Sequence, residues 1–202
     1  MLTKAEFAQR LKNACLSVIA AEAELTEIDA KFGDADHGFT MAKVCNAIIA
    51  AVDEADGGIQ TVLDDAAMAV MAINGGSAVP LWNTWLDGMQ EGAPEAEEID
   101  VAGIKAIFAK AFEELDEMSG AKVGDKTMMV ALIPASEAIA AYEGDSEAEL
   151  FTLAAAAAAA GAENSKNFPS KYGRAKSYGT KTIGTPDAGA MSMAKFFEGL
   201  AK

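Results

Sequence analysis

The chain has 202 residues, long enough for one domain whose core needs neither disulfides nor a structural metal. Its formal net charge is -15, from 16 Lys and Arg against 31 Asp and Glu, so most of its surface repels a polyphosphate backbone. Nucleic acid is therefore excluded as an expected partner. No composition break or linker divides the chain, and we expect residues 1–202 to form a single domain.

The two cysteines and the N-terminal segment predict the compartment. Cys15 and Cys45 lie on separate apolar stretches, and two isolated thiols form neither a disulfide framework nor a zinc site. No charge-free stretch reaches the roughly 18 residues needed to span a bilayer, and the first residues show no basic segment followed by an apolar run. We therefore expect a cytoplasmic protein without membrane contact.

The predicted elements are almost all helices. Thr3 and Glu6 form a capping-box pattern, and apolar residues then recur at three- to four-residue steps, predicting one long helix that ends near Gly33. Seven further helices are predicted over residues 41–55, 61–73, 81–89, 101–119, 127–142, 147–164 and 188–201. Only residues 180–183 favour a strand. The fold class is all-α, with about eight helices.

Two of the later segments are unusual. Seven consecutive alanines, residues 154–160, predict a tightly packed internal helix, because alanine favours helix and lets neighbouring helices approach closely. Residues 164–185 form the one long irregular stretch. Irregular segments of that length are uncommon in compact domains unless they are functional, so this stretch is a candidate part of a site.

An acidic motif follows the first predicted helix. Residues 33–38 read GDADHG, and Asp29 precedes them, so Asp29, Asp34 and Asp36 converge at one junction of helix and loop. Carboxylates that close repel one another unless a cation compensates them. Oxygen ligands in a short loop suit Mg²⁺, whereas zinc would require cysteine or further histidine ligands.

Paired aspartates in a short loop also occur in EF-hands, in aspartyl phosphatases and in plain turns. An EF-hand fails, because it needs an oxygen ligand two residues after Asp36, where Gly38 stands, and a glutamate at the twelfth position, where Cys45 stands. An aspartyl-phosphatase motif would follow a buried strand, but the preceding residues are helical and polar. A turn whose aspartates cap the next helix is the remaining alternative, against which Asp29 and His37 argue.

Several loops resemble phosphate-binding elements without matching a common nucleotide motif. Residues 74–77 (NGGS) precede a helix start, and residues 124–128 (GDKTM) open another helix with Lys126 as a candidate phosphate partner. Arg174 could fork onto phosphate oxygens, and Asp187 begins the last helix. Neither the Walker-A spacing nor G-x-G-x-x-G is present.

In this order, GDADHG, the Gly-Gly loop before a proline, GDKTM, GRA at 173–175 and IGTPDAGA at 183–190 resemble the L subunit of dihydroxyacetone kinases (DhaL). The likeness runs from about Leu2 to Leu200. The known fold of that family is an eight-helix antiparallel barrel with the nucleotide at one rim. The resemblance implies the same architecture here.

The resemblance also implies a ligand set. Asp29, Asp34 and Asp36 would hold two Mg²⁺ ions that bridge the phosphates of ADP or ATP. The residues implied to contact the nucleotide are His37, Gly38, Thr40, Gly75, Gly76, Ser77, Ala78, Gly120, Thr127, Met128, Arg174, Asp187 and Gly189. Among these, Gly120 and Met128 would border the adenine. No residue is assigned as a covalent catalyst, and phosphoryl transfer requires none.

In the DhaL family the L subunit supplies nucleotide and metal, while a separate K subunit holds the ketone on its own histidine. The resemblance therefore implies a K-type ketose-binding partner, with ATP as donor or with bound ADP recharged by a phosphohistidine protein of the sugar phosphotransferase system. A homodimer is a further expectation. A non-catalytic interaction module and a metal-dependent phosphatase for small phosphoesters are the alternatives.

The chain departs from the family pattern around the phosphates. Ala78 and Val79 stand where the family has serine and glycine, and Val130 stands where aspartate is common. Thr40 replaces an asparagine and Ala188 a proline. The metal carboxylates are intact. We interpret the chain as a divergent member that acts on another short ketose, or as one that kept the fold for a regulatory role.

Overall fold

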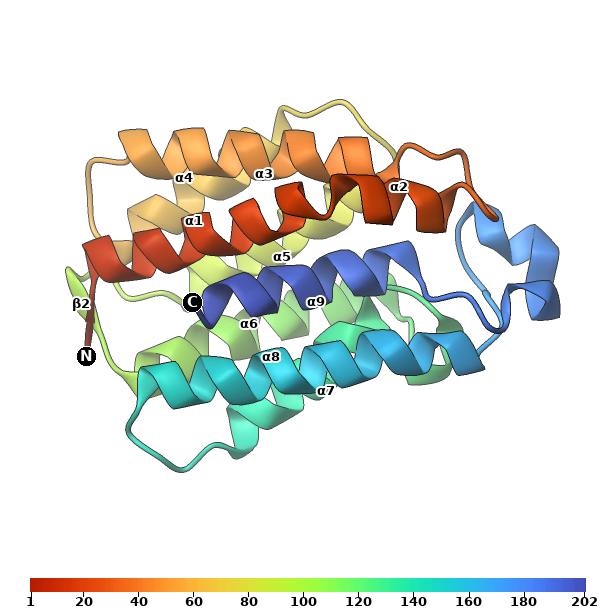
Figure 1. The fold of residues 1–202 in the computed structure, drawn as a ribbon. Coiled ribbons are helices and arrows are strands. Elements are labelled where there is room, and N and C mark those ends of the chain that lie inside the picture. Colours follow the sequence, from red (N-terminus) through yellow and green to blue (C-terminus); the bar gives the residue numbers. More distant parts are fainter.

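The computed structural model describes residues 1–202 and is built almost entirely of helices (Figure 1). The nine α-helices are α1 (Lys4–Ala20), α2 (Glu22–Asp29), α3 (His37–Glu54), α4 (Ile59–Met71), α5 (Ala78–Gly92), α6 (Val101–Ser119), α7 (Met129–Ala141), α8 (Glu147–Asn164) and α9 (Ala188–Leu200). None of them combines the length and the apolar character that a bilayer span requires. The predicted all-α class is confirmed.

Three short 3₁₀ helices and one minimal strand pair complete the chain. The 3₁₀ helices are η1 (Val123–Asp125), η2 (Ser165–Asn167) and η3 (Arg174–Thr182). Strands β1 (Leu2–Thr3) and β2 (Glu98–Ile99) pair antiparallel, with Leu2 opposite Ile99. This pair fastens the N-terminus to the connection between α5 and α6.

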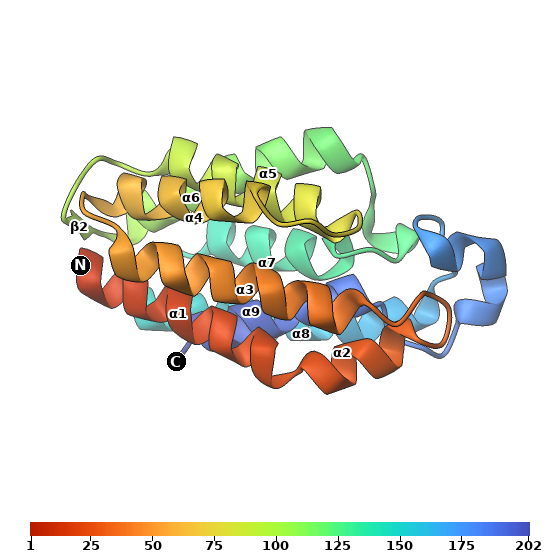
Figure 2. The same ribbon diagram turned by 90° about the horizontal axis from the view of Figure 1, so that it is seen from above.

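The helices form a closed ring around one apolar core. α1 packs on α3, each helix from α3 to α8 packs on the next, and α9 packs on both α8 and α1. α2 extends from the end of α1 and packs on α3 and α9. Figures 1 and 2 show the helices aligned along a common long axis. The two cysteines, Cys15 and Cys45, are buried in this core as free thiols, as the sequence predicted.

Aromatic side chains fill the middle of the ring. The ring centroid of Trp85 on α5 lies 5.3 Å from that of Phe196 on α9, and 6.1 Å from those of Phe108 and Phe197. Trp82 meets Phe196 edge-on at 5.3 Å. Tilted and edge-to-face pairs of this kind are favourable for aromatic rings. They bind α9 to α5 and α6 across the interior.

Small residues set the spacing where helices approach most closely. A Cβ atom on Gly161 of α8 would lie 2.2 Å from the carbonyl oxygen of Val130 on α7, and one on Gly199 would lie 2.3 Å from Cα of Ala14. The alanine tract before Gly161 is helical as predicted, but it is not internal. Only Ala154 and Ala158 within it are buried, because α8 packs on α7 and α9 with a single face.

Three further sequence predictions require correction. The first helix is interrupted at Ala21, whose N–H bonds the carbonyl of Val18 three residues back, so the chain tightens and α2 begins anew. The helix predicted from residue 41 begins at His37. Residues 180–183 form no strand, since the Thr182 hydroxyl donates to the Gly179 carbonyl at 2.8 Å and favours the turn.

The contact at Gly161 makes a direct stability prediction. Gly161→Ala should lower the free energy of unfolding by about 1–3 kcal/mol, because the new methyl group must push α8 away from the α7 backbone. Gly124→Ala is the matched control, since a Cβ there meets no atom within 4 Å, and it should change stability by about 0.5 kcal/mol or less. Urea unfolding of both variants tests this, and equal midpoints would contradict it.

Candidate functional site

A cavity of about 500 Å³ opens at one end of the ring. It is bordered by the last residues of α2, the first turns of α3, α5 and α9, the loop before α7, and residues 170–187. In Figure 2 this end lies opposite the one that carries the chain termini. Helix N-termini offer unpaired N–H groups and partial positive charge, so three of them around one cavity favour an anionic ligand.

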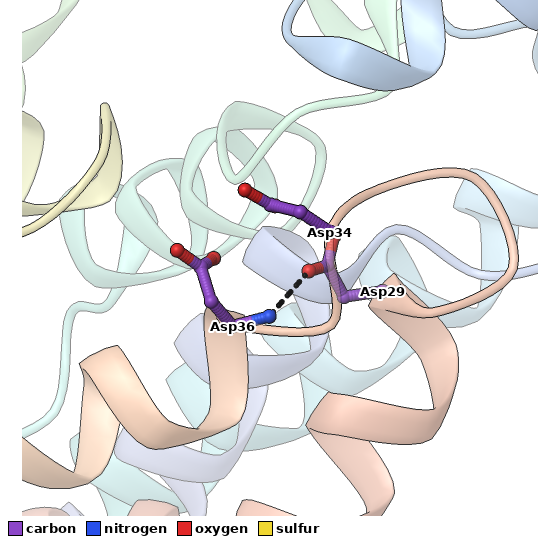
Figure 3. A group of neighbouring side chains, drawn as sticks. All are labelled: Asp29, Asp34 and Asp36. Carbon is purple, nitrogen blue, oxygen red and sulfur yellow. Dashed lines mark hydrogen bonds between the residues drawn. The ribbon is translucent and has the colours of Figure 1, made fainter.

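The acidic loop (residues 29–36) lies at the mouth of this cavity and brings three carboxylates together (Figure 3). One oxygen from each of Asp29, Asp34 and Asp36 lies within 4.8 Å of the others. Asp29 ends α2 and accepts hydrogen bonds from the N–H groups of Asp36 at 3.1 Å and His37 at 3.4 Å. A Cβ on Gly33 would lie 2.0 Å from Asp29 Oδ1, so glycine leaves room for this carboxylate.

The donor set of the acidic loop fits Mg²⁺. All three groups are hard oxygen donors, and they lie at a cavity that has room for water or phosphate oxygens as further ligands. Mg²⁺ prefers this combination of carboxylate, water and phosphate oxygens. The alternative, an aspartate that only caps the next helix, does not describe Asp36, whose side chain makes no capping hydrogen bond to α3. Two of the three carboxylates, Asp34 and Asp36, face solvent.

The only histidine lies between α3 and α9. His37 Nε2 and Ser192 Oγ are 3.1 Å apart, and Ser192 donates its own hydrogen to the carbonyl of Gly189 at 2.9 Å, so His37 donates to Ser192. Burial lowers the pKa of His37, although the nearby Asp29 and Asp36 act in the opposite direction. His37 therefore joins two helices at the cavity wall.

A buried lysine holds the segment opposite the acidic loop. Lys126 is almost fully buried, has a left-handed backbone (φ 59°), and donates from Nζ to the carbonyls of Thr182 at 2.6 Å and Thr185 at 2.7 Å. Burial lowers the pKa of Lys126, while Asp187 partly compensates. The residue that the sequence marked as a phosphate partner thus acts as a tether between the loop before α7 and the segment before α9.

Asp187 connects the same segment to α9. Its carboxylate accepts a hydrogen bond from the Ala190 N–H at 2.9 Å and caps α9, while its own N–H donates to Ser165 Oγ at 2.9 Å. Burial raises the pKa of Asp187 to about 6, against the opposing effects of the Ala190 N–H and Lys126. A Cβ on Gly189 would approach this carboxylate to 3.1 Å.

Most of the residues implied by the resemblance line the cavity. Those that do, besides the three aspartates, are His37, Thr40, Gly76, Ser77, Ala78, Thr127, Met128, Arg174, Asp187 and Gly189. Gly38, Gly75 and Gly120 do not line it. A Cβ on Gly38 would lie 2.1 Å from the Glu22 carbonyl oxygen, so this glycine lets α3 approach α2, and Gly120 ends α6 in a left-handed conformation.

Sequence reasoning missed the apolar part of the wall. Leu81 and Trp82 on α5, Met118 at the end of α6 and Phe32 in the acidic loop also line the cavity. Large apolar residues at helical spacing are typical of a core, and Trp82 does belong to it. The only local signal was the position of Leu81 and Trp82 directly after the glycine loop.

Comparisons with known proteins identify the family and the fold of this chain. Residues 31–202 match the family model described as the DAK2 domain. The chain belongs to the DAK2 domain family. The ADP-binding subunit DhaL of a PEP-dependent dihydroxyacetone kinase from Escherichia coli K12 is 26% identical over 191 residues, which cover 93% of this DAK2 chain and 91% of that subunit.

Longer relatives contain the same unit as one part. An L-erythrulose 1-kinase of Mycolicibacterium smegmatis is 34% identical over 193 residues, covering 90% of this DAK2 chain and 32% of the relative. The crystal structure of dihydroxyacetone kinase from C. freundii in complex with AMP-PNP and Mg²⁺ matches with a TM-score of 0.73 at 24% identity, over 98% of this chain and 33% of that one. This DAK2 chain thus spans about a third of the length of the erythrulose kinases.

Asp187 gives the DAK2 fold a pH-dependent stability. Because its pKa is raised from 3.8 to about 6 in the folded state, folding favours the protonated form, and this stabilisation is complete below pH 3.8 and lost as the pH rises through 6. Urea unfolding between pH 4 and 7 should show the wild type losing stability relative to Asp187→Asn as the pH rises. Parallel profiles for the two proteins would contradict the assignment.

Proposed function

We propose that this DAK2 chain is the nucleotide- and magnesium-binding unit of a dihydroxyacetone-type kinase, and that residues 1–202 act as one domain in this role. One observation carries the proposal: three carboxylates converge at the mouth of a cavity that three helix N-termini border. A metal ion with a polyphosphate is the ligand that complements both features at once. ADP or ATP with two Mg²⁺ ions is the expected occupant.

The cavity wall offers a separate place for each part of the nucleotide. The acidic loop and the starts of α3 and α5 suit the phosphates. The first N–H groups of α5 have no side-chain cap, and at the start of α3 only the N–H of His37 bonds a side chain, that of Asp29. Leu81, Met118 and Met128 provide an apolar surface that suits a purine ring. When bound, Mg²⁺ supplies neutralisation of the phosphate charge, which is the main requirement of phosphoryl transfer.

The protein's own groups then position and stabilise the phosphates. The backbone of residues 76–78 lies at the cavity, and its N–H groups remain available whichever side chains follow, so Ala78 and Val79 do not remove them. Arg174 also lines the cavity, and its planar guanidinium can pair with two phosphate oxygens. We assign no nucleophile, because positioning and charge stabilisation suffice for this reaction.

The acceptor must be held by another polypeptide unit. The chain has one histidine, His37, and its Nε2 is engaged with Ser192 Oγ at 3.1 Å, so this ring is not free to attach a carbonyl substrate. We therefore propose a K-type partner unit that binds the ketose. The erythrulose kinases among the relatives support a short ketose as acceptor, and the PEP-dependent relatives support ADP recharged by a phosphohistidine protein as an alternative to ATP.

A direct binding measurement tests the metal and nucleotide together. Asp34→Asn should weaken Mg²⁺-dependent ADP binding about 10-fold or more. Loss of a residue that only hydrogen-bonds to a metal ligand lowers metal affinity about 10–100-fold, and Asp34 is itself a proposed ligand. Asp64→Asn removes the same charge from an exposed position on α4 outside the cavity and should leave binding unchanged. Isothermal titration with and without Mg²⁺ measures both. Wild-type protein that binds no ADP in Mg²⁺ would contradict the proposal and favour the non-catalytic interaction module.

A turnover assay tests the need for a partner. The isolated chain with ATP, Mg²⁺ and either dihydroxyacetone or erythrulose should form no sugar phosphate, and adding a K-type ketose-binding unit should start the reaction. The same protein should release no phosphate from p-nitrophenyl phosphate. Partner-free release of phosphate from such an ester would favour the phosphatase alternative.

A further inference from the structure

Arg174 occupies the position of a counter-ion to the acidic loop. It is the first residue of η3, and its Nη2 lies 2.8 Å from Asp34 Oδ2. Gly173 before it has φ 61° and ψ -161°, a conformation essentially restricted to glycine, and this directs the chain into η3. No other salt bridge involves any of the three clustered aspartates. A guanidinium on residues 165–187 therefore neutralises part of the cluster.

This ion pair competes with a metal ion for the same carboxylate. The side chain of Arg174 is 72% exposed and that of Asp34 is 36% exposed, and ion pairs in water at such positions are weak. The guanidinium therefore lowers the affinity of the cluster for a free cation by a small factor and is displaced readily.

The backbone that carries Arg174 is held independently of this pair. The rings of Phe32 in the acidic loop and Tyr178 in η3 lie 5.2 Å apart, and Lys126 fixes the carbonyls of Thr182 and Thr185 at the end of the same segment. η3 lies beside the acidic loop (Figure 1), and these contacts that hold it do not involve the guanidinium. Only the Arg174 side chain has to turn, and it already faces the cavity.

From this geometry we infer that Arg174 makes the site selective for the metal–nucleotide complex over the free metal ion. A metal ion that arrives alone must displace the guanidinium from Asp34 and leaves it without a partner. A metal ion that arrives with a nucleotide brings phosphate oxygens, to which Arg174 transfers as a charge-assisted, forked pair. The inference rests on the proposed function and adds an order of binding to it.

The inference predicts that one substitution, Arg174→Gln, strengthens the binding of a free metal ion and weakens the binding of the nucleotide. In Arg174→Gln, Mn²⁺ alone should bind about two- to five-fold more tightly than in the wild type, the range expected for loss of one exposed ion pair. ADP in the presence of Mn²⁺ should bind more weakly, by about ten-fold, because the phosphates lose a charged partner. Electron paramagnetic resonance of free Mn²⁺ and isothermal titration of ADP measure the two affinities.

Two further variants separate this role from general effects of charge. Lys176→Gln removes a positive charge two residues away on η3, from an exposed side chain that does not line the cavity, and should change neither affinity. Arg174→Lys keeps the charge and should hold the affinity for Mn²⁺ alone near the wild-type value. The gain in Mn²⁺ affinity in Arg174→Gln should shrink in 0.5 M salt, since exposed pairs are screened.

The possible outcomes are distinct. Unchanged or weaker binding of Mn²⁺ alone by Arg174→Gln, with ADP binding weakened, would overturn the selectivity role and leave Arg174 a simple phosphate contact. An equal gain in Mn²⁺ affinity in Lys176→Gln would show that the effect comes from net charge alone, and this would also overturn the selectivity role of Arg174. Wild-type protein that binds neither Mn²⁺ nor ADP would refute the proposed function itself, and the inference with it.

Discussion

The packing of α9 between α8 and α1 is the constraint on which the site depends. The approach to α1 is possible because Gly199 has no side chain to meet Ala14, and the aromatic pair Phe196 and Phe197 anchors the helix in the core. α9 begins directly after Asp187. When α9 packs between α8 and α1, the segment that ends at Asp187 therefore lies near the acidic loop, some 150 positions earlier in the sequence. Core packing at one end of α9 thus positions charged groups at the other.

The site concentrates features that oppose folding. Three carboxylates gather without enough positive charge to balance them, and the half-buried Asp187 and the buried Lys126 line the same cavity. Both non-glycine residues with positive φ, Ala35 and Lys126, also belong to this end of the molecule. Unfavourable backbone and charge arrangements persist where the surrounding structure fixes them, and they are typical of functional sites. The favourable packing of the long helices offsets the unfavourable free energy of these backbone and charge arrangements.

The features that could be predicted from the sequence are those determined by residues close together in the chain. The bounds of α6 and α8 were correct because Asp100 and Ser146 cap them through their side chains, and the fold class followed from helical periodicity. The acidic cluster was predictable because its members share one short junction. The Lys126 tether was not, since its partners lie more than 50 positions away and a lysine two residues after a glycine in a loop resembles a phosphate ligand. The break at Ala21 carries no glycine or proline signal, and packing of α2 on α3 and α9 decides it.

The tether has a consequence for how this site can change over time. Lys126 grips two backbone carbonyls, and a carbonyl is present whatever amino acid occupies positions 182 and 185. The two hydrogen bonds from Lys126 therefore do not depend on the side chains at positions 182 and 185. Side chains along the neighbouring stretch that face the cavity, such as Tyr172 and Ala175, can be exchanged without releasing the segment. Substitutions in this segment can therefore change which ligand or partner the site prefers, while the backbone that presents the phosphate-binding groups keeps its position.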